Sequence, residues 1–156
     1  MKRGQFWYGD FLVAVLILMI IGFLFVASIR DLTSRNEVLK DLILDASEIS
    51  STLMSEGTGT LENWQEGIGT LGLINNYKFS GSKWNDFDTL NYNQQKYMLG
   101  TLNNVWVYLK DRERIILDSS EEITSVQDIE ANNLVHIKRF IFYGDDIHTL
   151  GVVVWR

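Results

Sequence analysis

Few residues in this sequence are of a type that carries out chemistry. It contains two histidines, His136 and His148, and no cysteine. The absence of cysteine excludes disulfides, thiol catalysis and zinc–thiolate sites. The histidines fall on opposite arms of a predicted hairpin, where we expect His136 to face about residue 153 and His148 about residue 141. Because they are several residue pairs apart, we predict no metal ion shared between them.

Adjacent carboxylates are the second chemical feature. Glu121-Glu122 and Asp145-Asp146 both fall in predicted turns, where carboxylates are usually solvated. Asp145-Asp146 with Asp118 or Glu130 would supply oxygen ligands for weak calcium binding, but the spacing of an EF-hand loop is missing. The sequence contains no catalytic motif and no phosphate-binding glycine loop. It therefore predicts no enzymatic activity, no metal site and no cofactor.

The element that positions everything else is an apolar N-terminal segment. Residues 11–29 carry no charge, and their only strongly polar side chain is that of Ser28. As a helix they would extend about 28 Å, enough to cross the hydrocarbon core of a bilayer. A basic and aromatic segment, residues 1–10, precedes them. We therefore predict a transmembrane helix, with membrane lipid as a partner.

A secretory signal peptide is the competing interpretation of this N-terminus. The start Met1-Lys2-Arg3 fits it, but the apolar run is too long, and Phe25 stands three residues before a cut after Ala27. For an uncleaved anchor, the positive charges on the two sides nearly balance. Because a large C-terminal domain translocates largely regardless of charge, we expect a cytoplasmic N-terminus and an extracellular head.

The rest of the chain is acidic. Residues 31–156 hold 19 acidic and 11 basic side chains, a net charge of −8. Phosphates would be repelled by such a surface, which argues against nucleic acid as a partner.

The predicted helix continues beyond the membrane as an amphipathic segment, residues 30–56. Its apolar residues follow a 3-4-3-4 spacing that places them on one stripe, which we expect to pack against the head or against neighbouring helices. Ser34 followed by Glu37 is a capping-box pattern that would start a new helix there; without that break, residues 11–54 would form one helix of about 66 Å. The residues of this packing seam are Ile29, Leu32, Leu39, Ile43, Ala46 and Leu53.

Residues 57–156 predict a small α+β head with an antiparallel sheet. The run Gly57-Thr58-Gly59-Thr60 is expected to be a hinge. A helix is predicted from Asn91 to Gly100, preceded by a helical turn over 82–90, and the loop 119–133 is expected to hold one helical turn at 125–130. Four strands are predicted, at 105–109, 114–117, 135–143 and 149–155, the last two joined by a turn at 144–146.

The N-terminal residues resemble a known leader. Lys2-Arg3-Gly4-Gln5 before an apolar run is similar to the archaeal class III prepilin leader, in which a dedicated peptidase cuts between Gly and Gln. That pattern includes an acidic residue near the new N-terminus. Here it is Asp10, the sixth residue counted from Gln5 where the family usually has it fifth. The resemblance implies that Asp10 pairs with the freed α-amine of a neighbouring subunit, since an unpaired charge in lipid is costly.

The head resembles archaeal pilin-like proteins in the order of its short motifs: Gly59-x-x-x-x-Trp64, Leu71-Gly72-Leu73, Leu90-x-Tyr92-x-x-x-Lys96-x-x-Leu99-Gly100 and the final strand Val152–Arg156. The resemblance implies a structural subunit of a type IV pilus-like surface filament, a minor pilin or pseudopilin, with other pilin-like subunits as partners. The alternative is an uncleaved, membrane-anchored extracellular binding or accessory protein. In that case Trp7 and Tyr8 form an interfacial aromatic belt and Asp10 lies at headgroup level.

Overall fold

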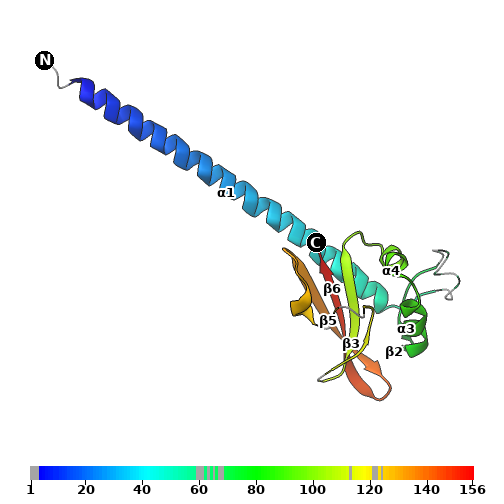
Figure 1. Ribbon diagram of the computed structural model, residues 1–156. Helices are drawn as coiled ribbons and strands as arrows, with labels where there is room; N and C mark the ends of the chain where they lie inside the picture. The colour runs from blue at the N-terminus through cyan, green and yellow to red at the C-terminus, as the bar shows by residue number, and fades with distance from the viewer. Residues whose placement is uncertain are drawn as a thin grey trace. The chain divides into compact units, whose positions relative to one another are not determined.

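A computed structural model describes residues 4–58, 62, 64, 66, 69–112, 114–120, 123 and 125–156, with the side chains of 4–7, 34 and 35 outside the description. The fold is α+β, one long N-terminal helix followed by a small antiparallel β-sheet domain (Figure 1). The chain divides into two compact units, Met1–Val38 and Leu39–Arg156. The last turns of the long helix therefore belong to the same unit as the sheet.

The long helix, α1, runs from Gly4 to Leu53. Proline is absent from the sequence, and no glycine occurs between Gly22 and Gly57. The backbone is helical through Ser34, so the capping pattern at that residue does not begin a new helix. From Phe11 to Val26 the large apolar side chains other than Val15 are at least half exposed. Of the described residues, α1 is the one helix long and apolar enough to cross a membrane.

The C-terminal end of α1 is held by the segment that returns past it. Leu73 N donates to Leu53 O at 2.9 Å and Ile74 N to Ser55 O at 3.1 Å, which satisfies carbonyls left free at a helix end. Gly57 turns the chain with φ of +61°, and a Cβ added at Gly72 would overlap the backbone of Gly57. Thr58 and Thr70 pair in an antiparallel bridge. Of the predicted hinge, Gly57 and Thr58 are thus held in place, while Gly59 and Thr60 lie outside the described residues.

A small hairpin follows that the sequence pattern did not predict. It comprises β1 (Ile74–Asn75) and β2 (Lys78–Phe79), and its turn residues Asn76 and Tyr77 have φ of 49° and 64°. Two positive φ values are typical of the type I′ turn that fits the twist of a hairpin. Asn-Tyr is not the usual Asn-Gly signal for this turn, because a tyrosine is strained there.

Two short helices, α3 (Gly81–Asp88) and α4 (Tyr92–Met98), come next. Asn91 and Gln94 form a reciprocal capping box at the start of α4, with hydrogen bonds of 3.0 and 3.1 Å. Gly100 follows the helix with φ of +71°. The predicted helix between Asn91 and Gly100 is confirmed, and α3 occupies most of the predicted helical turn at 82–90.

The sheet has four strands in the order β4-β3-β6-β5, all antiparallel. All four were predicted, and the last two meet at the two-residue turn Gly144-Asp145. His136 pairs with Val153 and His148 with Ile141, as the position of the turn predicted. A short 3-10 helix, η1 (Val126–Asp128), lies within the loop where one helical turn was expected. The strands are β3 (Asn104–Lys110), β4 (Ile115–Asp118), β5 (Leu134–Tyr143) and β6 (Asp146–Trp155).

Alternation along the strands gives the sheet two buried faces. One face packs with the C-terminal part of α1; its fully buried side chains include Val107, Leu109, Leu150 and Val152. On the other face Trp106, Tyr108 and Val153 form a cluster covered by residues of the loop that contains η1. The Tyr108 ring lies over Gly151, its partner on β6, where an added Cβ would overlap the ring. Tyr108 Oη is 2.8 Å from His136 Nε2.

The Tyr108–His136 pair makes the stability of the head depend on pH. Burial, and then the nearby Lys138 ammonium, lower the pKa of His136 below its ordinary value of about 6.5. Unfolded chains therefore bind a proton at this residue more readily than folded ones, so stability is lost as the pH falls below about 6.5. We expect the melting temperature to fall between pH 7.5 and 5.5, and to fall less in His136→Gln. Circular dichroism of the detergent-solubilised chain measures both; equal falls would contradict the assignment.

Candidate functional site

The candidate site is the surface of α1. Within the head unit, packing against the rest of the domain determines which side of the helix is buried and which side is exposed. Within the head unit, Leu42, Ala46, Ile49 and Leu53 are at most 1% exposed. Their spacing of three or four residues places them on one face of the helix. That face is already used by the core of the head, so it has no surface left for another molecule.

Polar contacts fix the rotation of this part of the helix. One carboxylate oxygen of Asp45 accepts hydrogen bonds from Thr101 Oγ1 at 2.6 Å and from Asn103 Nδ2 at 2.8 Å. On another side of the helix, Oγ of the buried Ser50 accepts a hydrogen bond from Arg139 Nε of β5 at 3.1 Å. Together with the buried face, these contacts hold α1 in one orientation against the head.

The predicted packing seam is divided by this orientation. Ala46 and Leu53 are buried in the head, whereas Leu39 is 39% and Ile43 is 48% exposed. In the N-terminal unit, Ile29 and Leu32 are 46% and 59% exposed. We call the four exposed members, Ile29, Leu32, Leu39 and Ile43, the free seam. The buried face also includes Leu42 and Ile49, which the predicted seam lacked.

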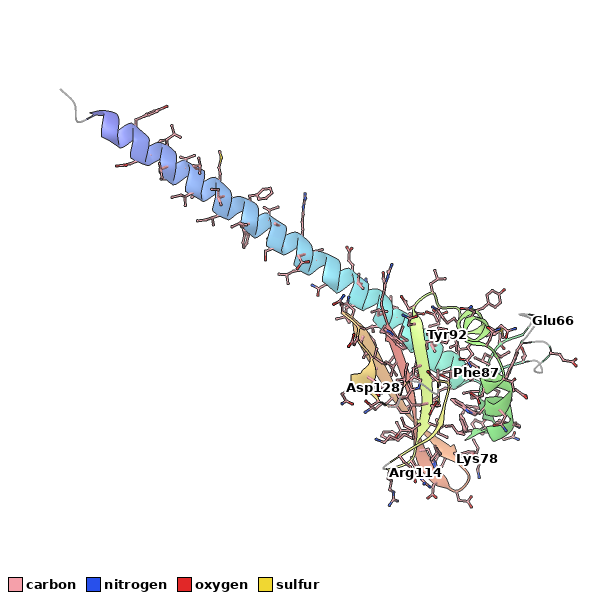
Figure 2. All side chains as sticks on the ribbon, viewed as in Figure 1. Glu66, Lys78, Phe87, Tyr92, Arg114 and Asp128 are labelled. Carbon is pink, nitrogen blue, oxygen red and sulfur yellow. The ribbon has the colours of Figure 1, made fainter. Side chains whose placement is uncertain are left out.

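Of the leader pattern Lys2-Arg3-Gly4-Gln5, the last two residues lie at the start of α1, and Lys2 and Arg3 are outside the described residues. Gly4 and Gln5 are in its first turn, with the Gln5 side chain outside the description. Asp10 is exposed, one residue before the apolar run Phe11–Ile29. Side chains radiate from α1 along the whole of this apolar stretch (Figure 2). Apolar side chains thus flank a single carboxylate on an uncovered helix.

The candidate metal ligands of the head do not gather among the residues that the structure describes. These residues leave out Glu121 and Glu122, and within them no three His, Asp or Glu side chains lie together in a way that would hold a metal ion. Asp145 Oδ1 lies 4.0 Å from Lys78 Nζ at the surface. Among the described residues, Asp145 is not part of a metal-binding group with Asp118 or Glu130. His148 pairs with Ile141 and His136 with Val153, so the two imidazoles lie several pairs apart.

The outer side of the β5–β6 hairpin exposes three large apolar residues, which we call the hairpin patch. Phe140 is 79%, Phe142 54% and Ile147 61% exposed, and Phe142 pairs directly with Ile147. Strand propensity alone gave no sign of this patch. The continuous run from Phe140 to Tyr143 is typical of a strand buried on both faces, yet here the cover of one face ends before the hairpin tip.

Comparisons with protein-family models, with curated proteins and with solved structures give no match for this chain. Its function is therefore argued from its own residues.

The division of α1 into a buried and a free side predicts different effects for two isoleucines six residues apart. Ile49→Ala should lower the free energy of unfolding by about 2–5 kcal/mol, because it leaves a cavity in the core. Ile43→Ala, the same change on the half-exposed side, should change it by less than about 0.5 kcal/mol. Chemical denaturation followed by tryptophan fluorescence measures both values. Equal losses would show that Ile43 is also held in the fold of the isolated chain.

Proposed function

We propose that this protein is a structural subunit, a minor pilin or pseudopilin, of an archaeal type IV pilus-like surface filament that assembles through its apolar N-terminal helix. The free seam carries this proposal. Its last three residues continue the apolar character of α1 beyond the membrane-length segment that ends at Ile29, and all four side chains are exposed. Exposed apolar side chains at helical spacing are what a neighbouring helix packs against.

The proposal also accounts for the basic start and the carboxylate of α1. Lys2-Arg3-Gly4-Gln5 would be the leader, cut between Gly4 and Gln5, and the freed α-amine would pair with Asp10 of a neighbouring copy. A carboxylate within an apolar helix bundle is costly unless a cation neutralises it. Before assembly the N-terminus would be cytoplasmic, with the head outside the cell membrane.

An uncleaved membrane-anchored binding protein is the second candidate, favoured by the hairpin patch. Phe140, Phe142 and Ile147 together expose apolar surface of the kind that marks interaction sites on soluble domains. Under this function the anchor would only tether the head. The two candidates make opposite predictions about the N-terminus.

Removal of the leader distinguishes them. We expect the intact mass of the protein from its native membrane to correspond to loss of Met1–Gly4. Gly4→Val, which alters the residue before the cut, should retain the full mass, whereas Gly9→Val should still be processed. A full-length mass for the native protein would overturn the filament proposal in this form and favour the anchored binding protein.

Asp10 predicts a second, independent outcome. Asp10→Asn should reduce incorporation into filaments at least tenfold, because a neutral amide cannot pair with an α-ammonium group. Membrane insertion should be unchanged, because an amide is tolerated next to an apolar run at least as well as a carboxylate. Asp41→Asn, an exposed carboxylate farther along α1, is the matched control. Immunoblots of sheared filaments and of membranes measure the two pools, and normal incorporation of Asp10→Asn would refute the pairing.

A further inference from the structure

One edge of the sheet borders a groove that the filament proposal does not use. It is a cavity of about 470 Å³ between β4 and the α3–α4 segment. The backbone of residues 115–120 forms one wall, Asp88, Tyr92 and Gln95 form the other, and Trp84 and Leu90 supply apolar surface at its base. We call it the β4 groove. Its volume lies within the range of cavities that bind ligands.

The strand that lines this groove lies at an edge of the sheet, with no strand on its outer side among the described residues. β4 is the last strand of the sheet and pairs only with β3. Leu117 is opposite Leu109, and Ser119 N donates to Val107 O at 2.9 Å, so the amides of these two residues point toward β3. Alternation then directs the N–H and C=O of Asp118 away from β3. Ile116 is the extra residue of a bulge, without a partner in the register.

The opposite wall is rigid. Tyr92 Oη donates to Asn104 Oδ1 at 3.3 Å and accepts from Val105 N at 3.1 Å, which ties α4 to the end of β3. Gln95 is 4% exposed, and its Nε2 donates to Leu90 O at 3.1 Å and to Phe87 O at 3.4 Å. These hydrogen bonds hold the α3–α4 wall of the groove in place.

The charge of the groove selects among possible occupants. Its described lining contains no cationic side chain, and the carboxylate of Asp118 places negative charge in it. Asp118 Oδ1 already accepts a hydrogen bond from Ser120 N at 3.2 Å, which fixes the position of its carboxylate. A lysine or arginine complements this lining, and an acidic chain would be repelled.

We propose that the β4 groove binds an extended segment of a partner protein that adds as a fifth strand beside β4 and carries lysine or arginine side chains. Free strand-edge amides provide the main-chain hydrogen bonds of such a complex, and the adjoining groove receives alternate side chains. Six residues, 115–120, span about 20 Å, so the segment that fits is about six residues long.

The other edge of the sheet is unsuited to the same role. The middle of β5 carries Lys138 and Arg139, and charged side chains on an edge strand oppose pairing with another strand. The Tyr143 end of β5 is covered by β2, with the Phe79 and Tyr143 rings 5.3 Å apart. Strand addition therefore has one favoured edge, and this inference does not depend on whether α1 assembles into filaments.

The test uses the full chain in nanodiscs and a fluorescein-labelled, end-blocked hexapeptide of alternating valine and lysine, (Val-Lys)3. We expect saturable binding by fluorescence anisotropy, and slower hydrogen–deuterium exchange at residues 115–120 but not in β5. The (Val-Glu)3 peptide should bind at least tenfold more weakly. A (Val-Lys)3 peptide with all its amides N-methylated should not bind, because it cannot make the main-chain hydrogen bonds.

Asp118→Asn keeps the size of the side chain and removes its charge. It should weaken (Val-Lys)3 binding about threefold, the effect of one partly exposed ion pair. Asp146→Asn, on the hairpin outside the groove, should leave binding unchanged. Absence of binding at 1 mM peptide, equal binding of the lysine and glutamate peptides, or protection in β5 in place of residues 115–120 would each overturn the proposal.

Discussion

The rest of the structure depends on the rotational setting of the last turns of α1 against the head. Four apolar residues, from Leu42 to Leu53, are buried there, and the hydrogen bonds of Asp45 and Ser50 hold the helix on either side of them. A helix with apolar residues on more than one side can pack in several rotations. Here the polar contacts distinguish them, because any other rotation would leave the carboxylate and the Arg139 guanidinium without these partners. Within the head unit, this rotation determines which side of the helix from Leu39 to Leu53 is buried and which side is exposed.

The free side then follows from geometry. Leu39 and Ile43 lie within the head unit but outside its core, and they have the helical spacing of Ile29 and Leu32 before them. A soluble domain gains stability by burying such residues. The cost of keeping them exposed is offset only if they pack against something else. A neighbouring copy of the same helix meets that requirement with the same residues, which is why the filament proposal needs no additional surface on the head.

Most elements of the fold were predictable from local sequence, and the rotation of α1 was not. Asn91 and Gly100 marked the ends of α4 because capping and positive φ are local requirements, and the short turn after Tyr143 set the register of His136 and His148. Periodicity did not show which seam residues the head buries, because Leu39, Leu42, Ile43 and Ile49 are all apolar and allow two overlapping stripes. The bonds that choose between the stripes join Asp45 to residues 56 and 58 positions away, which no periodicity reveals. The β4 groove could not be predicted for the same reason, because the residues of its two walls are distant in sequence.

The charge of the head links the two proposals. Residues 57–156 hold 13 acidic and nine basic side chains, a net charge of −4, so heads brought side by side repel one another over about 8 Å at physiological ionic strength. In the proposed filament, the attraction between subunits would therefore come from the uncharged helix surface, which includes the free seam. The same repulsion makes an acidic segment of another head a poor occupant of the β4 groove, whose described lining is also anionic. A partner that binds there has to bring positive charge, so the groove favours a different protein over a second copy of this chain.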